Sequence, residues 1–210
     1  MPRAAKFGEE QILAAAGRLI ASHGPGGATI EAIARDLGAS TGSIYHRFDS
    51  RDVLLAQVWL RAASEFQKSF FAHLTGPLPE QAGLAAALFM PQRVREHPRE
   101  ARLLFLHRRE DFVDRGWPET MRRRAAELGH QVETQLRAFS RRLTGRADAR
   151  TVWTMTYAVV DTPFAAVRRY VAANEDPPPY VDDLIRTTYE AVLAFVGGAA
   201  RRARHRRDPR

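Results

Sequence analysis

Apolar residues recur at spacings of three and four after Thr29, which predicts a short amphipathic helix. Its inward face consists of Ile30, Ile33, Ala34 and Leu37. Thr29 is placed to cap the amino terminus of this helix, and Gly38 follows its last apolar residue, where a left-handed conformation allows a sharp turn. A second, very short helix is predicted after Ser40, with Ile44 and Phe48 as apolar anchors. This pattern is typical of a helix-turn-helix.

The apolar periodicity of the other segments also predicts helices, so the expected fold class is all-α with about nine helices. A first helix is expected over residues 9–23, ended by GPGG, and a long helix is expected from the cap Ser50 to Leu74. Pro91 should kink or split the helix that starts near Glu80, because proline removes a backbone donor. Later helices are expected from Pro98, from Pro118 to Leu143, from Ala147 to Ala173 with a kink at Pro163, and from Pro179 to Val196, where Gly197 and Gly198 stop the chain of hydrogen bonds.

The second short helix has an outward face of small and polar residues. A helix of about two turns is unstable alone and needs support from the helices behind it. Small side chains allow close approach to the DNA major groove, and polar ones can reach phosphates and base edges. Gly42 destabilises a helix interior by about 1 kcal/mol relative to Ala, which suggests close approach to another molecule. The alternative is a generic helical hairpin of an all-α protein.

Residues 29–55, TIEAIARDLGASTGSIYHRFDSRDVLL, are similar position by position to the DNA-binding signature of the tetracycline-repressor (TetR) family. The resemblance extends over most of residues 8–60 and implies a positioning helix, a recognition helix and the start of a linking helix. Family members often carry Lys where this chain has Thr41, and they carry Lys or Arg at the position of Arg51, which is therefore expected to contact a phosphate. The predicted DNA-binding residues are Thr29, Ser40, Thr41, Gly42, Ser43, Tyr45, His46 and Arg51.

The net charge of +8 does not come from the segment that resembles a DNA-binding domain. Residues 1–55 contain six basic and six acidic residues, whereas residues 201–210 contain six arginines and one aspartate. DNA binding therefore has to depend on the placement of individual side chains rather than on bulk charge. The arginine-rich tail either attracts DNA nonspecifically or serves solubility, and its expected state is disordered.

No catalytic, metal or cofactor site is expected, because no nucleophile motif, phosphate loop or histidine pair with metal-ligand spacing is present. The absence of cysteine excludes disulfides and thiolate zinc sites. No segment is apolar enough to span a membrane, and the amino terminus lacks a hydrophobic signal core. A non-enzymatic, soluble, cytoplasmic protein is expected.

The TetR resemblance implies three regions: a DNA-binding domain over residues 1–52, a ligand-sensing and dimerisation domain over 53–200, and the tail over 201–210. The candidate ligand contacts are Phe105, His107, Trp117, Met121, Trp153 and Tyr157. The ligand class is expected to be a small, mostly apolar molecule, because such pockets are chiefly apolar. The last two apolar helices are expected to pair with those of a second subunit through Val152, Met155, Val159, Phe164, Leu184, Thr188, Val192 and Phe195. From the sequence pattern alone, these helices are equally compatible with an intramolecular core.

Two functions follow as hypotheses. The first is a homodimeric transcriptional regulator, usually a repressor, that binds a pseudopalindromic operator in double-stranded DNA and is released by a small-molecule effector. The second is a ligand-binding or interaction module that keeps the fold without reading a specific DNA sequence, which the neutral charge of residues 1–55 and Thr41 favour.

Overall fold

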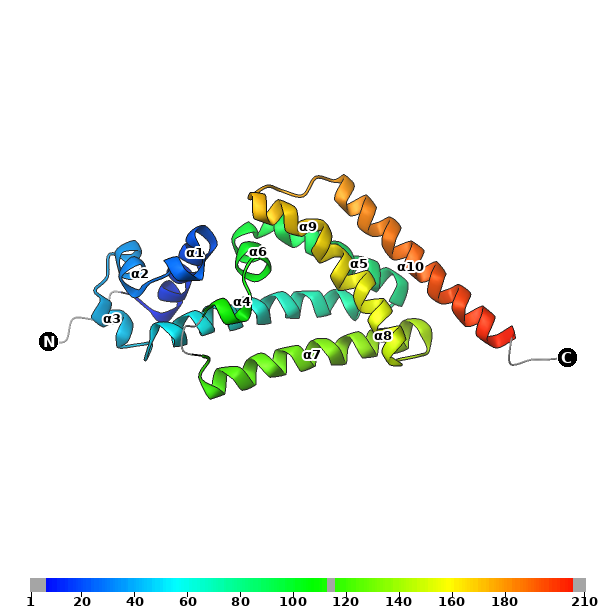
Figure 1. Ribbon diagram of the computed structural model, residues 1–210, viewed down its shortest axis with the longest axis horizontal. Coiled ribbons are helices and arrows are strands. Elements are labelled where there is room, and N and C mark those ends of the chain that lie inside the picture. The colour runs from blue at the N-terminus through cyan, green and yellow to red at the C-terminus, as the bar shows by residue number, and fades with distance from the viewer. Residues whose placement is uncertain (1–6, 113–115, 206–210) are drawn as a thin grey trace. The chain divides into compact units, whose positions relative to one another are not determined.

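The computed structural model describes residues 7–112 and 116–205, with side chains described up to residue 197. All regular structure in these ranges is helical, which confirms the expected all-α class. The α-helices are α1 to α10, and nine helical runs result when α8, a π turn and α9 are counted as one (Figure 1). The chain divides into two compact units: residues 1–66 with 97–129, and residues 67–96 with 130–210. This division differs from a single boundary at residues 52/53 because α4 and α7 each have residues in both units.

Unit 1 contains the three helices predicted for the DNA-binding segment, namely α1 (Glu9–Gly27), α2 (Ile30–Leu37) and α3 (Thr41–Tyr45). It also contains the first part of α4 (Arg51–Leu74), α6 (Pro98–Phe105), a 3₁₀ turn (Arg109–Phe112) and the first part of α7 (Glu119–Thr144). The apolar faces of these helices form one core. Ile12, Ile20, Ile33, Ile44 and Phe48 are fully buried in it, in agreement with the predicted inward positions.

The predicted end of the first helix after residue 23 coincides with a break in the helical conformation of α1. The helix is interrupted at Gly24, which has a φ of 72°, and then continues as a single turn to Gly27. Pro25 has no N–H to donate to the Ala21 carbonyl, and Nε of Arg102 on α6 donates to this carbonyl instead, at 2.8 Å. A side chain of unit 1 thus supplies the hydrogen bond that the proline removes.

Unit 2 contains the end of α4, α5 (Pro79–Glu96), the end of α7, α8 (Ala149–Thr156), α9 (Thr162–Ala173) and α10 (Tyr180–His205). Helix α5 packs on both α9 and α10. It is continuous through Pro91, so the helix is not split there, while the predicted kink stays a prediction. Pro91 itself is buried among neighbours on the face that also carries Ala87, Met90 and Val94, and this packing outweighs the lost hydrogen bond.

Glycine allows α5 and α10 to approach closely within unit 2. A Cβ atom at Gly83 would overlap the Tyr189 hydroxyl and lie 2.5 Å from Cζ of Phe139. The Tyr189 hydroxyl donates to the carbonyl of Glu80 at 2.9 Å. Burial raises the pKa of this phenol, which therefore stays protonated as a donor. The other end of α5 is held by Arg95, which pairs with Asp182 at 2.7 Å and donates to the carbonyl of Pro177 at 2.8 Å.

The predicted helix from Ala147 to Ala173 is present as α8 and α9, joined by a π turn over Tyr157–Asp161. The backbone N–H of Thr162 donates to the carbonyl of Tyr157, five residues earlier. Pro163 follows directly and cannot donate to the carbonyl four residues before it, so the irregularity expected at this proline lies in the turn before it.

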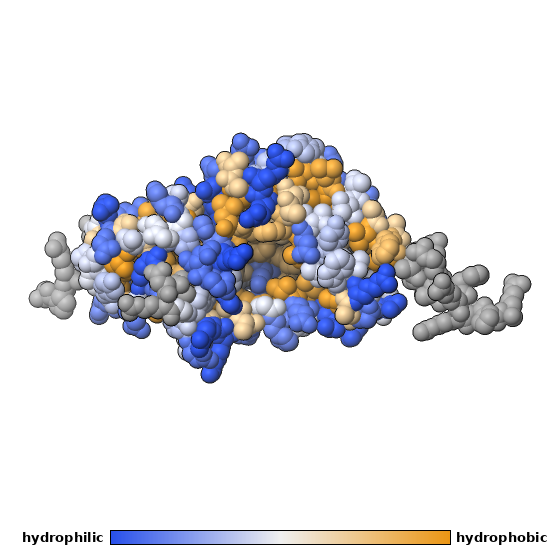
Figure 2. Space-filling view, in the orientation of Figure 1, coloured by the Kyte–Doolittle hydropathy of each residue, from blue (hydrophilic) through white to orange (hydrophobic). Residues whose placement is uncertain are grey.

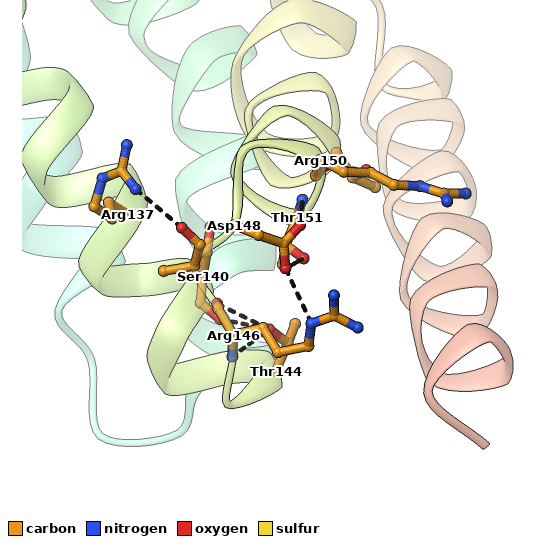
Figure 3. A network of polar contacts seen from close by, with 9 residues as sticks. Arg137, Ser140, Thr144, Arg146, Asp148, Arg150 and Thr151 are labelled. Carbon is orange, nitrogen blue, oxygen red and sulfur yellow. Dashed lines mark hydrogen bonds and ion pairs between the residues drawn. The ribbon is translucent and has the colours of Figure 1, made fainter. Parts of the chain in front are cut away.

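The turn between α7 and α8 and the carboxyl end of α10 are the last features of unit 2. Side chains hold the turn between α7 and α8: Asp148 caps α8 through the Thr151 N–H at 3.1 Å, and Thr144 accepts from the Arg146 N–H at 3.1 Å (Figure 3). Helix α10 continues through Gly197 and Gly198 to His205, so the predicted stop at these glycines is wrong. Residues 201–205, expected in a disordered tail, belong to this helix, and residues 206–210 lie outside the described residues.

Candidate nucleic-acid interface

Helix α2 begins and ends where its sequence predicts. The Thr29 hydroxyl accepts the backbone N–H of Ala32 at 3.1 Å, which caps the helix. Gly38 adopts the left-handed conformation, with a φ of 63° and a ψ of 35°. Glu31 lies in the first turn, where its charge complements the helix dipole. The sharp turn at Gly38 directs the chain straight into α3.

Helix α3 is short and is held by hydrogen bonds at its amino terminus and by two buried side chains. The Ser40 side chain accepts the backbone N–H of Ser43 at 3.3 Å, and the Ser43 hydroxyl donates to the carbonyl of Ser40 at 2.7 Å. Ile44 is fully buried, and Phe48 after the helix is buried at 1% exposure. Burial of these two side chains on the core of unit 1 fixes α3 although it is too short to be stable alone.

The opposite face of α3 is open to solvent. Thr41, Gly42, Tyr45 and His46 are exposed, with Tyr45 at 53%, while Ser43 is half-buried. A Cβ at Gly42 would meet only the Ser40 hydroxyl, at an ordinary 4.0 Å. Packing within the protein therefore does not require glycine here, which leaves close approach of another molecule as the physical reason for it. Thr41, Gly42, Tyr45 and His46 thus share one small polar face of α3 beside its cap Ser40, and Thr29 is exposed at the start of α2.

The Arg51 side chain is engaged by backbone carbonyls of unit 1. Its Nη2 donates to the carbonyl of Pro25 at 2.6 Å and its Nε donates to the carbonyl of Ala28 at 3.1 Å. The side chain is only 20% exposed. Arg51 therefore holds the connection between α1 and α2 against the start of α4, and its phosphate contact stays a prediction. The partners lie 23 and 26 residues earlier in the chain, so local sequence reasoning could not identify them.

The cations of the helix-turn-helix differ in how they are engaged. Arg18 on α1 pairs with Asp36 on α2 at 2.6 Å, and Arg47 donates to the carbonyl of Ser43 at 3.0 Å. Arg35, in the last turn of α2, is exposed and has no ion pair or hydrogen bond to any other described residue. Sequence reasoning missed this residue, although its place on the polar face of α2 could have indicated it.

The candidate ligand contacts are divided between the units. In unit 1, Phe105 is buried edge-on against Phe66, and Trp117 is buried and donates to the carbonyl of Arg109 at 3.2 Å. The remaining two of this unit, His107 and Met121, are half-buried. In unit 2, Trp153 and Tyr157 are stacked on each other and exposed at 64% and 43%. Neither ring of this stacked pair lies in the core of unit 2, so neither lines a buried cavity within that unit.

The candidate dimer contacts fall into two groups. Met155 and Val159 are fully buried within unit 2 and cannot reach a second subunit. Leu184 and Phe195 on α10 are exposed at 59% and 51%. Apolar surface is visible along the α10 side of unit 2 (Figure 2). The half-buried candidates are Val152, Phe164, Thr188 and Val192.

Metal-ligand groups and membrane-spanning helices are both absent from the described residues. Among these residues, no group of three or more His, Asp or Glu side chains is placed to hold a metal ion. Within the same ranges, no helix is both long and apolar enough to cross a membrane.

The capped helices α2 and α3 and the exposed polar face of α3 form a helix-turn-helix of the kind found in DNA-binding proteins. A family profile described as bacterial regulatory proteins, tetR family, matches residues 12–58. This match confirms the predicted resemblance of residues 29–55 to the DNA-binding segment of that family. A search of curated protein sequences finds no significant match.

Solved structures share the fold over nearly the whole chain. A transcriptional regulator from Rhodococcus sp. RHA1 is 19% identical, with a TM-score of 0.69 over 90% of this chain and 97% of its own. The fatty acid degradation regulator FadR from Bacillus halodurans is 17% identical, with a TM-score of 0.66 over 90% and 96%. FadR from Bacillus subtilis, solved in complex with stearoyl-CoA, is 14% identical, with a TM-score of 0.66 over 89% and 98%. Identities this low establish a common fold only.

Proposed function

We propose that this protein is a homodimeric repressor that binds a pseudopalindromic operator through α3 and is released by a small, mostly apolar effector. The observation that carries the proposal is the outward face of α3, where Thr41, Gly42, Tyr45 and His46 are exposed on a helix fixed by its Ser40 cap and two buried anchors. A recognition helix needs this combination of a rigid support and a surface that can approach base edges.

Phosphate contacts have to come from a few cations, because residues 1–55 carry no net charge. Arg35 is the cation of α2 that is exposed and without a partner among the described residues. The backbone N–H groups at the start of α3 and the hydroxyls of Thr29 and Ser40 can supply uncharged phosphate contacts. With so few charged contacts, the operator affinity should depend only weakly on salt concentration for a DNA-binding protein.

The proposed operator binding calls for a dimer, because one short helix without charged side chains offers few contacts to DNA. Two such helices about 34 Å apart can enter successive major grooves of one operator. The exposed apolar residues Leu184 and Phe195 of α10 support a subunit interface on that helix.

Release by an effector requires that the effector bind the DNA-incompetent arrangement more tightly than the competent one. Two proteins with the same fold are named FadR; one is described as a fatty acid degradation regulator, and the other was solved with stearoyl-CoA. Stearoyl-CoA is therefore the first compound to test, although its coenzyme A group makes it larger and more polar than the effector class expected from the sequence. The structural likeness itself does not assign this ligand.

The test is fluorescence anisotropy with labelled DNA from upstream of the protein's own gene, at 150 mM salt. Replacing Tyr45 and His46 by Ala should weaken binding at least about tenfold, since each contact to a base edge contributes about 1–3 kcal/mol. The control is Lys68→Ala, an exposed residue of α4 in unit 2. Addition of stearoyl-CoA should lower the affinity of the unmodified protein.

The neutral charge of the first 55 residues favours one alternative, a protein of the same fold that does not read a specific DNA sequence. The same experiment separates the two. Equal binding to upstream and scrambled DNA, unaffected by the Tyr45 and His46 substitutions, would support the alternative and reject the repressor.

A further inference from the structure

A surface groove of about 300 Å³ lies within unit 1, between α1, α4 and α6. Its floor is apolar and is formed by the buried side chains of Leu13, Val58 and Leu103. None of these three residues was a predicted ligand contact, and the groove contains none of the candidate ligand residues named from the sequence.

Between Leu13 on the floor and the charged residues at the rim, α1 lines the groove with two small residues, Ala14 and Gly17, which leave the space open. A Cβ at Gly17 would meet Cγ1 of Val58 at an ordinary contact distance of 3.9 Å, so helix packing does not require glycine there. Glycine in a helix interior destabilises the helix relative to alanine. We therefore attribute the glycine at position 17 to the open space of the groove, which a side chain there would reduce.

The charged residues at the rim are engaged with one exception. Arg61 pairs with Glu10 and Glu65, and Arg18 pairs with Asp36 at 2.6 Å. Glu100 is not free either. Arg99, at the start of α6, is exposed and has no ion pair or hydrogen bond to another described residue. An apolar floor beside one uncompensated cation is complementary to a molecule with a compact apolar body and a single negative charge.

We propose that this groove binds a small amphipathic carboxylate, with its apolar body on Leu13, Val58 and Leu103 and its carboxylate at Arg99. The volume lies at the lower end of the range of about 300 to 1,000 Å³ for small-molecule pockets. A coenzyme A thioester is too large for it, so the site is separate from that of the effector discussed above.

The groove has a regulatory consequence because its walls come from different parts of unit 1. Helix α1 supports α2 and α3, whereas α6 lies outside the helix-turn-helix in the chain. A ligand that touches both biases their relative arrangement, and its binding is then coupled to that of DNA. This consequence rests on the proposed function, whereas the binding itself does not.

The experiment is isothermal titration calorimetry of the full chain, without DNA, using 4-phenylbutyrate and the uncharged 4-phenylbutan-1-ol. The unmodified protein should bind the acid more tightly than the alcohol. Arg99→Gln should weaken the acid about tenfold and leave the alcohol unchanged, because only the charged contact is removed. Ala14→Leu should weaken both compounds, because leucine is a good helix former and fills the groove.

Arg108→Gln is the matched control, since Arg108 is exposed in unit 1 but lies outside the groove. Circular dichroism of each variant establishes that it is folded, and Arg99→Gln, at an exposed position, decides the question if Ala14→Leu does not fold. Absence of binding to the unmodified protein, or binding that neither Arg99→Gln nor Ala14→Leu alters, overturns the proposal. Because no DNA is present, these outcomes are independent of whether the protein is a repressor.

Discussion

Arg51 connects the carbonyls of Pro25 in the last turn of α1 and of Ala28 after it to the first turn of α4, and its hydrogen bonds require the planar guanidinium fork. Lysine in its place keeps the charge but cannot donate to Pro25 and Ala28 in the same geometry. We expect Arg51→Lys to lower the free energy of unfolding by about 1 kcal/mol and Arg51→Ala by about 2 kcal/mol, with urea unfolding as the measurement.

Arg35→Ala is the matched control, because Arg35 is exposed and without a partner among the described residues. It should change the free energy of unfolding by less than about 0.5 kcal/mol. A purely phosphate-binding Arg51 would give the reverse result: Arg51→Ala would leave the urea midpoint unchanged and lower only the DNA affinity.

His107 introduces a pH dependence at the same end of α1. Its pKa is lowered from the ordinary 6.5, chiefly because burial disfavours the charged ring; nearby Asp111 raises it, and Arg102 lowers it further. The unfolded chain therefore binds a proton at a higher pH than the folded protein. The contribution of His107 to stability is present above pH 6.5 and declines as the pH falls through the folded pKa.

The measurement is the urea midpoint at pH 7.5 and at pH 5.5. We expect the unmodified protein to lose more stability over this interval than His107→Gln, which cannot titrate at this position. His46→Gln serves as the control, because His46 is exposed on α3. Equal losses for the unmodified protein and His107→Gln would rule out this contribution.

Hydrogen bonds between residues close together in the sequence could be predicted, whereas those between residues far apart in the sequence could not. Thr29, Ser40 and Ser50 cap the helices that follow them, as expected, because a cap bonds to an N–H three residues on. The role of Arg51 depends on carbonyls more than twenty residues away. The resemblance placed it in the right segment, but only the fold determines the direction of its side chain.

At the scale of elements, two glycines in helix interiors differ in what surrounds them. A Cβ at Gly83 of α5 would overlap Tyr189 and Phe139, whereas a Cβ at Gly129 of α7 would meet no atom within 4 Å. Gly83→Ala should therefore destabilise the protein by about 1 to 3 kcal/mol through overpacking. Gly129→Ala should stabilise it by about 0.5 to 1 kcal/mol through helix propensity.

The pair is internally controlled, since both substitutions add the same methyl group to a helix. Thermal unfolding monitored by circular dichroism measures both. A stabilised Gly83→Ala would mean that α5 and α10 do not approach each other as closely as the structure indicates.

Helix starts were predicted better than interruptions and ends. Gly197 and Gly198 do not end α10, because glycine lowers helix stability without blocking a hydrogen bond. Pro163 does remove a backbone hydrogen bond, and the helix continues through a π turn before it instead of ending. Pro91 also removes a backbone hydrogen bond, yet α5 continues because the face of the helix that carries Pro91 is buried. The outcome at each position is decided by tertiary packing, which the sequence pattern does not contain.

At the scale of the whole molecule, the apolar residues of α8 to α10 had to be divided between a core and a subunit interface. The periodic pattern marked both sets as apolar, but Met155 and Val159 are buried in unit 2, whereas Trp153, Leu184 and Phe195 are exposed. Trp153 was predicted as a ligand contact, and its 64% exposure makes it a better candidate for the interface. Only the three-dimensional packing separates these two uses of the same residue types.

If α10 forms the interface, a charge on its exposed apolar face should separate the subunits. We expect Leu184→Glu to give a mass near 23.6 kDa, instead of twice that value, in size-exclusion chromatography with light scattering. The fold of each subunit should be kept, because Leu184 is 59% exposed and contributes little to the core. Affinity for a two-half-site operator should fall about a hundredfold, because the second half-site is no longer bound by a linked subunit.

Arg186→Glu controls for the added negative charge, since Arg186 is exposed and lies about 200° around the helix from Leu184. This variant should remain dimeric and bind the operator as the unmodified protein does. A dimeric mass for Leu184→Glu at micromolar concentration would place the interface elsewhere. Loss of the dimer without loss of operator affinity would show instead that each subunit binds its half-site independently, because linkage of the two α3 helices is the only reason for dimerisation to raise the affinity.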